Sequence, residues 1–171
     1  GKFIMVDSKG TLHKGRTELQ KDFKEKWHFC QITNAEQRKG GIAEAMEGAD
    51  VVIGLAKPGP DVIKKEWIKK MAKDSIVFAC ANPIPEIYPW EAKEGGARVI
   101  ATGRSDFPNQ VNNSLCFPAI FRGTLDVMAK TITDEMCIAS ARELAKCAED
   151  KGLKEDYLLP TMDEWEVFPR Q

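Results

Sequence analysis

Short runs rich in Val and Ile recur along this chain, and apolar residues between them follow helical spacing. There are five such runs, the weakest at residues 29–32 and the clearer ones at residues 3–6, 51–54, 76–79 and 99–101. Helical spacing is found in residues 41–48 and 61–72. Strands buried on both faces of a parallel sheet form continuous apolar runs, and helices connect them. The pattern therefore predicts an α/β fold with a doubly wound parallel sheet of the Rossmann type.

The second half of the chain predicts helices outside this sheet. A short helix is expected at residues 90–94, after a proline-rich loop. Apolar residues over 113–128 suit a helix that Pro118 kinks or delays. Thr133, followed by two acidic residues, predicts the N-cap of a further helix that ends near Glu149.

The composition is that of one globular domain without a strongly charged face. Of 171 residues, 43% are apolar, and 25 basic and 26 acidic side chains leave a net charge of −1. This balance offers no basic surface to a nucleic acid or an anionic membrane. The apolar runs are also far shorter than the ~20 residues of a membrane span. No linker or repeat is visible, so residues 1–171 are interpreted as part of a single domain.

The cysteine and histidine residues show no metal-binding pattern. The two histidines, His13 and His28, are interpreted as surface residues. The cysteines are odd in number, without CxxC spacing: Cys30, Cys80, Cys116, Cys137 and Cys147. Reduced thiols in a cytoplasmic compartment fit these features best. We therefore assign no metal ligand to this chain.

The predicted sheet lacks its central strand. The run that ends in Asp7 has the character of strand 2, and strand 1 lies between strands 2 and 4 in the order 3-2-1-4-5-6. The glycine-rich turn G-x-G-x-x-G, which belongs to strand 1, is also missing from the sequence. The first residues include no initiator Met and no leader. We therefore expect a Rossmann domain that is incomplete at its amino-terminal end.

Polar residues after the first run suggest contacts with a dinucleotide. Asp7 ends the run, as does the acidic residue that hydrogen-bonds the adenosine ribose of NAD. An Asp at a strand end equally often starts a turn. The carboxylate would repel the 2′-phosphate of NADP, so NAD is favoured. NADP stays open, because Ser8 and Lys9 offer a hydroxyl and an ammonium group to a phosphate.

Three later loops add further candidates. Ala56 and Lys57 follow the second clear run, and Asn82 follows the third, so all three lie at the carboxyl edge of the sheet, where ligands of open α/β folds bind. Each also suits a simple connection between elements. Asn112 and Asn113 precede the predicted kinked helix, so that one can cap it while the other points amide donors at an anion.

Several strings resemble the bacterial-type malic enzymes, in order and over most of the chain. They are residues 5–10, 15–16, 81–86, 101–113 and 117–123. The resemblance implies oxidation of L-malate with NAD or NADP and a divalent metal, Mg or Mn, followed by decarboxylation of bound oxaloacetate to pyruvate. It also implies a homo-oligomer, such as a dimer.

The resemblance further implies roles for individual residues. Asp7 would meet the adenosine ribose, Asn82 would lie at the nicotinamide ribose and malate, and Asn112 and Asn113 would face nicotinamide and the malate carboxylate. At Ala56-Lys57 the chain departs from the smaller or hydroxylic residues usual in these enzymes. The resemblance implies that the catalytic lysine and tyrosine of the family, and its metal ligands, precede the first residue. The upstream catalytic and substrate domain is therefore expected to be absent from this chain. No catalytic residue is therefore assigned here.

Two other hypotheses remain at this point. A Rossmann domain of another dehydrogenase, for example one acting on amino acids, keeps the fold and changes the chemistry. A non-catalytic nucleotide-sensing module would explain the absence of catalytic residues in another way. The string at Asn112-Asn113 argues against the first, and the missing central strand argues against the second.

Overall fold

Three parallel strands form the sheet of the computed structural model, which describes residues 2–170 except for the side chains of Trp165 and Arg170. The strands are β3 (Val51–Gly54), β4 (Ile76–Ala79) and β5 (Val99–Thr102), paired in the order β3-β4-β5. These are the three later strands that the apolar runs predict, with β5 one residue longer. The Rossmann-type α/β prediction is confirmed, and the sheet is partial.

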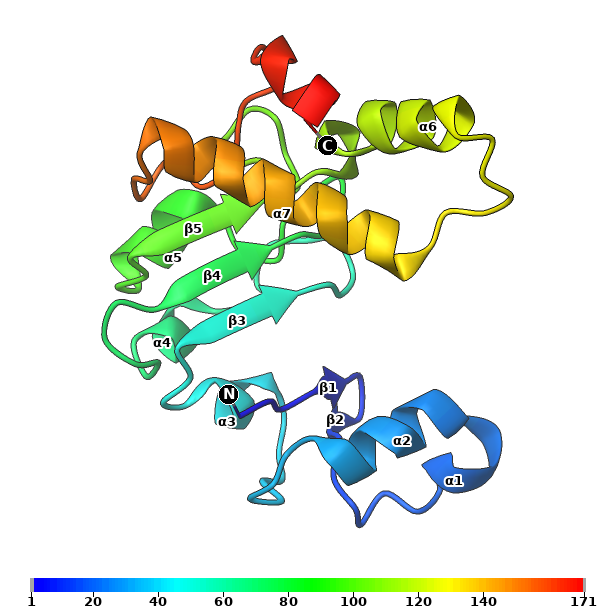
Figure 1. Cartoon of the computed structure of the whole chain (residues 1–171). Helices are drawn as coiled ribbons and strands as arrows, with labels where there is room; N and C mark the ends of the chain where they lie inside the picture. Colours follow the sequence, from blue (N-terminus) through cyan, green and yellow to red (C-terminus); the bar gives the residue numbers. More distant parts are fainter. Residues whose placement is uncertain (1, 171) are drawn as a thin grey trace.

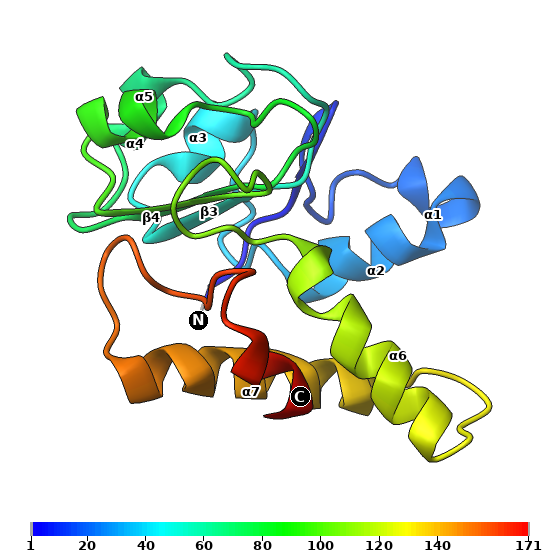
Figure 2. The ribbon, with the colours of Figure 1, turned by 90° about the horizontal axis from the view of Figure 1, so that it is seen from above.

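Helices cover the two sides of the sheet unequally. Helices α3 (Ile42–Met46), α4 (Lys65–Ile68) and α5 (Pro89–Glu94) lie on one side, and the long helix α7 (Asp134–Lys151) lies on the other (Figures 1 and 2). The main core lies on the side of the three short helices. It includes Met46, Ile63, Ile68, Val77, Ala79, Ile87 and Ala92.

Helix α4 is shorter than the sequence predicts. Regular spacing suggested a helix over residues 61–72, but α4 begins at Lys65 and ends at Ile68. Asp61 has a φ of 73°, and Lys64 is extended, so the backbone enters a helical conformation only after Lys64. The apolar residues of the predicted stripe still reach the core, because Ile63, Ile68 and Met71 are buried.

The amino-terminal segment forms a two-stranded antiparallel ribbon and two helices rather than a strand of the parallel sheet. The strand expected at residues 3–6 is reduced to β1 (Val6–Asp7), which pairs antiparallel with β2 (Gly10–Thr11). The prediction of a weak strand at residues 29–32 is wrong. These residues end helix α2 (Lys24–Ile32), in which Cys30 is buried against Leu12 and Leu19. The short helix α1 (Leu19–Asp22) precedes it.

The carboxyl-terminal third folds around α7. Thr133 caps this helix, as predicted, by accepting a hydrogen bond from the Met136 N–H. The helix predicted over 113–128 is divided into the 3₁₀ turn η1 (Asn113–Leu115) and α6 (Phe117–Asp126). Pro118 therefore lies in the first turn of α6, where a missing N–H has no cost. The tail forms a second 3₁₀ turn, η2 (Trp165–Arg170).

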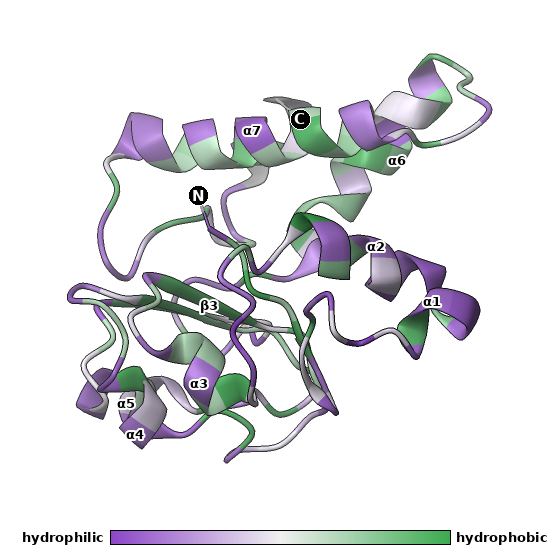
Figure 3. Cartoon of the chain, turned by 90° about the horizontal axis from the view of Figure 1, so that it is seen from below, coloured by the Kyte–Doolittle hydropathy of each residue, from purple (hydrophilic) through white to green (hydrophobic). Residues whose placement is uncertain are grey.

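One edge of the sheet is open, and apolar side chains in and just after the edge strand β3 are exposed. Strand β3 pairs with β4 alone among the described strands. Val51, Ile53 and Leu55 are 45%, 60% and 80% exposed, although alternate apolar residues of a parallel sheet are normally covered. Figure 3 shows this strand as a hydrophobic ribbon. Among the described residues, none of the helices is both long and apolar enough to cross a membrane.

Candidate cofactor-binding site

Loops that leave β4 and β5 meet at the carboxyl edge of the sheet, around Gly103. The Asn82 amide lies beside this glycine, and a methyl group added at Gly103 would be 3.5 Å from its Oδ1 and Nδ2 atoms and 3.1 Å from the Cys80 carbonyl oxygen. On the other side, the Asn112 Nδ2 donates to the Gly103 carbonyl at 2.9 Å. The loops therefore come together closely at Gly103, and a side chain there would require the Cys80 carbonyl to shift by a few tenths of an ångström.

Asn112 and Asn113 take different positions. Asn112 is the N-cap of η1, because its Oδ1 accepts a hydrogen bond from the Ser114 N–H at 3.0 Å. Both ends of the Asn112 amide are therefore engaged within the protein. The Asn113 side chain is exposed, as is that of Asn82. Of the two neighbouring amides, that of Asn113 is the more exposed.

The loop after β3 lies next to the loop after β4. Ala56 and Lys57 are exposed, and the Ala56 N–H donates to the carboxylate of Glu86 at 2.9 Å. Glu86 follows Asn82 in the same proline-rich loop and is completely buried. The two candidate loops are thus joined by a partly buried hydrogen bond.

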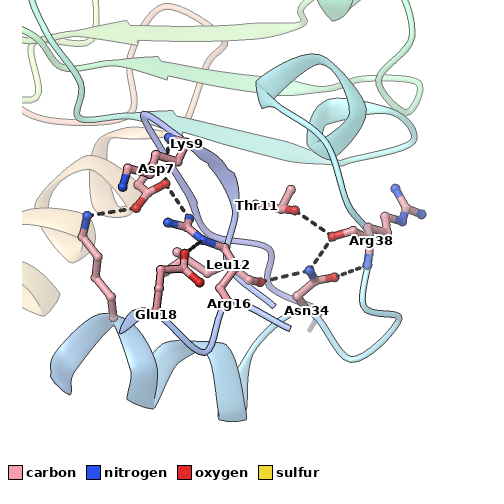
Figure 4. Close-up of polar contacts among 9 residues, drawn as sticks. Asp7, Lys9, Thr11, Leu12, Arg16, Glu18, Asn34 and Arg38 are labelled. Carbon is pink, nitrogen blue, oxygen red and sulfur yellow. Dashed lines mark hydrogen bonds and ion pairs between the residues drawn. The ribbon is translucent and has the colours of Figure 1, made fainter. Parts of the chain in front are cut away.

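Asp7 lies in a cluster of charges at the end of β1 (Figure 4). Its Oδ1 accepts hydrogen bonds from the Arg16 guanidinium at 2.7 Å and from the Lys9 backbone N–H at 3.0 Å, and its Oδ2 accepts one from the Lys26 ammonium at 2.9 Å. Arg16 also donates to Glu18 at 2.8 Å. The Asp7 side chain is 14% exposed and that of Arg16 is 8% exposed.

These contacts keep the Asp7 carboxylate ionised. Burial raises the pKa of this carboxyl, but hydrogen bonds from Arg16, Lys26 and the Lys9 backbone outweigh it and lower the pKa to about 2. The hydrogen bond to Asp7 raises the pKa of Arg16 in turn. The cluster of Asp7, Lys9, Arg16, Glu18 and Lys26 carries three positive and two negative charges, so its net charge is about +1 at neutral pH.

One donor of this cluster has no partner. The Nη2 atom of Arg16 is buried and makes no hydrogen bond among the described residues. Ser8 and Lys9, which follow Asp7 in the sequence, have exposed side chains. The cluster therefore offers free donors and, at Asp7, an ionised acceptor that already takes three of its roughly four possible hydrogen bonds. These groups fit the hydroxyl and phosphate groups of a nucleotide.

A divalent metal does not fit the residues that the structure describes. Among them, no three His, Cys, Asp or Glu side chains come together as a metal site. Mg²⁺ and Mn²⁺ prefer carboxylate oxygens, and the carboxylates near the candidate loops, Asp7 and Glu86, already accept bonds from protein donors.

Comparison with known families agrees with this arrangement of loops around a parallel sheet. Residues 1–169 match the family described as "Malic enzyme, NAD binding domain". The chain belongs to the malic enzymes. The match covers nearly every residue, and it favours neither the amino-acid dehydrogenase hypothesis nor the nucleotide-sensing hypothesis.

Individual malic enzymes resemble the chain closely over part of their length. The NAD-dependent malic enzyme of Geobacillus stearothermophilus is 46% identical over 98% of the chain, and the NADP-dependent malic enzyme of Halomonas elongata is 40% identical over 92%. The crystal structure of the Entamoeba histolytica malic enzyme is 56% identical over 98% of the chain, with a TM-score of 0.93. The chain spans 34%, 39% and 35% of these proteins.

Within this malic enzyme domain, the predicted site residues fall into two groups. Asn82, Asn112 and the Ala56-Lys57 loop lie along the carboxyl edge, and Asn113 follows Asn112. Asp7, Ser8 and Lys9 belong to the other sheet, the β1-β2 ribbon, which lies beyond the open edge of β3 (Figure 1).

Sequence reasoning gave no role to four residues that shape these groups: Glu86, Gly103, Arg16 and Lys26. Three of them, Glu86, Gly103 and Arg16, occur in the strings that resemble malic enzymes, at residues 81–86, 101–113 and 15–16. Lys26 has no such signal, because it reaches Asp7 from helix α2, which is 17 or more residues away in the sequence. The sequence does not mark Glu86 as buried, since Glu is rarely fully buried unless it is paired.

Proposed function

We propose that this chain is the cofactor-binding part of a longer malic enzyme. The enzyme oxidises L-malate and decarboxylates it to pyruvate and CO₂, and it reduces NAD or NADP. The observation that carries the proposal is the match of residues 1–169 to the NAD-binding domain family, together with exposed amides at the carboxyl edge of a parallel sheet.

The proposed cofactor lies across both groups of site residues. The adenosine ribose meets Asp7, with Ser8 and Lys9 beside it. The rest of the dinucleotide follows the edge past Ala56, Lys57, Asn82 and Asn112. When bound, its nicotinamide ring supplies the hydride acceptor. Asn112, whose amide is engaged with Gly103 and Ser114, contributes mainly by shaping the loop.

Malate is proposed to bind at Asn82 and Asn113. The exposed Asn113 amide donates to a malate carboxylate, and Asn82 orients malate next to the nicotinamide ribose. We propose that the acid-base groups and the ligands of Mg or Mn belong to parts of the enzyme outside this chain. A homo-oligomer such as a dimer and a cytoplasmic location complete the proposal.

NAD is the proposed preferred cofactor. The ionised Asp7 carboxylate favours hydroxyl donors over a 2′-phosphate. Arg16 and Lys26 compensate part of its charge, so the repulsion of NADP is weaker than Asp7 alone suggests. Among relatives, one malic enzyme is named NAD-dependent and another NADP-dependent.

An assay of the full-length enzyme tests the proposal. Malate, Mn²⁺ and either cofactor are mixed with the enzyme, and reduced nicotinamide and pyruvate are measured together. We expect both products in equal amounts, and only when malate is present. Reduction driven by an amino acid instead of malate would favour the other dehydrogenase hypothesis, and cofactor binding without any turnover would favour the sensor.

A further inference from the structure

Glu86 is a buried carboxylate that joins the ends of two strands. Its side chain is 0% exposed. One carboxylate oxygen accepts a hydrogen bond from the Ala56 N–H at 2.9 Å, and the other accepts one from the Ala81 N–H at 3.0 Å. Ala56 follows β3, and Ala81 follows β4. The carboxylate therefore fixes the spacing between the two loops that leave these strands.

The surrounding backbone makes room for this carboxylate. A methyl group at Gly54 would lie 2.8 Å from the Glu86 Cδ atom, closer than atoms can approach without displacement. The main chain of the Glu86 segment also holds the first loop, since the Glu86 carbonyl accepts from Ile63 N–H at 3.1 Å and the Ile84 carbonyl accepts from Gly59 N–H at 3.2 Å. The missing side chain at Gly54 thus makes room for the Glu86 carboxylate and not only for a ligand.

A carboxylate suits this position for a chemical reason. Each of its oxygens accepts hydrogen bonds, whereas the amide of Gln has one acceptor and one donor group. A Gln at position 86 would turn its donor toward one of the two backbone N–H groups. No salt bridge to Glu86 occurs among the described residues, so the two N–H groups compensate the cost of its burial. Retaining such a group in a core indicates a task beyond packing.

We propose that Glu86 is a positioning residue that makes the cofactor loop and the malate loop one rigid unit. Lys57 follows Ala56 directly, and Asn82 follows Ala81 directly, so displacement of either N–H group displaces a proposed ligand contact. The proposal rests on the proposed function, because it assigns a structural cause to cofactor and malate binding at the same site. It names no catalytic role for Glu86.

The test compares Glu86→Gln and Gly54→Ala with Val77→Ala in the full-length enzyme. Val77 is 0% exposed in the core of β4, so its truncation lowers the melting temperature without altering the strand-end loops. For Glu86→Gln, losing one buried hydrogen bond predicts about a tenfold rise in the cofactor Kd and about a tenfold fall in malate kcat/KM at saturating cofactor. Gly54→Ala should likewise raise the cofactor Kd and lower malate kcat/KM. Val77→Ala should leave both quantities within about twofold of the wild type.

A double variant separates positioning from general destabilisation. If Glu86 acts on malate through Asn82, adding Glu86→Gln to Asn82→Ala causes little further loss of malate kcat/KM, while the cofactor Kd still rises. Independent losses that multiply would overturn the proposal. The proposal would also be overturned if Glu86→Gln lowered the melting temperature but left the cofactor Kd and malate kcat/KM unchanged. If Glu86→Gln does not fold, the same two quantities measured for Gly54→Ala test the proposal in its place. A wild-type enzyme without malate turnover contradicts the proposed function itself, whereas active wild type with unaffected variants contradicts the role of Glu86 alone.

Discussion

Replacing Asp7 by Asn should lower the free energy of unfolding of the amino-terminal segment, by an amount that depends on pH. The change keeps the size of the side chain and removes the charge that Arg16 and Lys26 share. In the folded protein the pKa of Asp7 falls from 3.8 to about 2. At about 1.4 kcal/mol per unit, this sets an upper bound of about 2.5 kcal/mol on its contribution to stability at neutral pH. Lys26 is 42% exposed, so solvent screening reduces the expected value to about 1–2 kcal/mol.

The direction of this pH dependence follows from the lowered pKa of Asp7. The contribution of Asp7 is complete above the unfolded pKa of 3.8, and it is lost as the pH falls through the range from about 4 to about 2. Near pH 3 roughly half of it should remain. Below about pH 2 the wild type and the Asn variant should therefore have the same stability, as far as this residue is concerned.

The assay is urea unfolding of the full-length enzyme between about pH 3 and pH 7, followed by tryptophan fluorescence in a variant that retains Trp27 and carries Trp67→Phe, Trp90→Phe and Trp165→Phe. Trp27 in α2 packs against the small core beside the cluster. Glu18→Gln is the matched control, because it removes a charge from the same Arg16 at an exposed position, where the loss should be much smaller. Equal losses in the two variants, or a loss for Asp7→Asn that does not change with pH, would refute the reasoning.

Three further predictions concern the ligands and the open sheet. The full-length enzyme should have a lower KM for NAD than for NADP in steady-state assays, because of the Asp7 carboxylate, and the reverse order would point to Ser8 or Lys9. Asn82→Ala and Asn113→Ala should each lower malate kcat/KM by an amount equivalent to about 1–3 kcal/mol, with less change in cofactor affinity for Asn113→Ala, and wild-type efficiency in both would remove these two substrate contacts. The 171-residue chain made alone should neither oxidise malate nor melt cooperatively, because the edge of β3 is unpaired and its apolar residues are exposed, so a sharp calorimetric transition with tight NAD binding would contradict this expectation.

Local sequence pattern was sufficient for the central part of the fold. Strands β3, β4 and β5 could be predicted because each apolar run has the length of one buried strand and turn residues bound it. The cap of α7 at Thr133 was likewise a local signal. Residues 29–32 could not be assigned in this way, since a short apolar run suits a strand or a buried helix equally, and packing of Cys30 against Leu12 and Leu19 decides in favour of the helix.

The candidate site was predictable in position more than in detail. Asn82 and Asn112 follow strands, so their meeting at one edge of the sheet could be expected from topology. Which of Asn112 and Asn113 caps the following turn depends on backbone geometry, and only the structure shows that Asn112 does. Similarly, the charge near Asp7 depends on Arg16 and Lys26, which reach it from later segments of the chain.

Two glycines at strand ends illustrate why small residues alone do not locate a ligand. Gly54 and Gly103 both lie at the carboxyl edge, where close approach of a cofactor is one explanation for a missing side chain. In this structure the space beside Gly54 is filled by the Glu86 carboxylate, and the space beside Gly103 is filled by the Asn82 amide and the Cys80 carbonyl. Gly54 is therefore required by a protein group, and a side chain at Gly103 would be crowded by one. Those protein groups, in turn, hold the side chains and backbone amides that a dinucleotide and malate would contact.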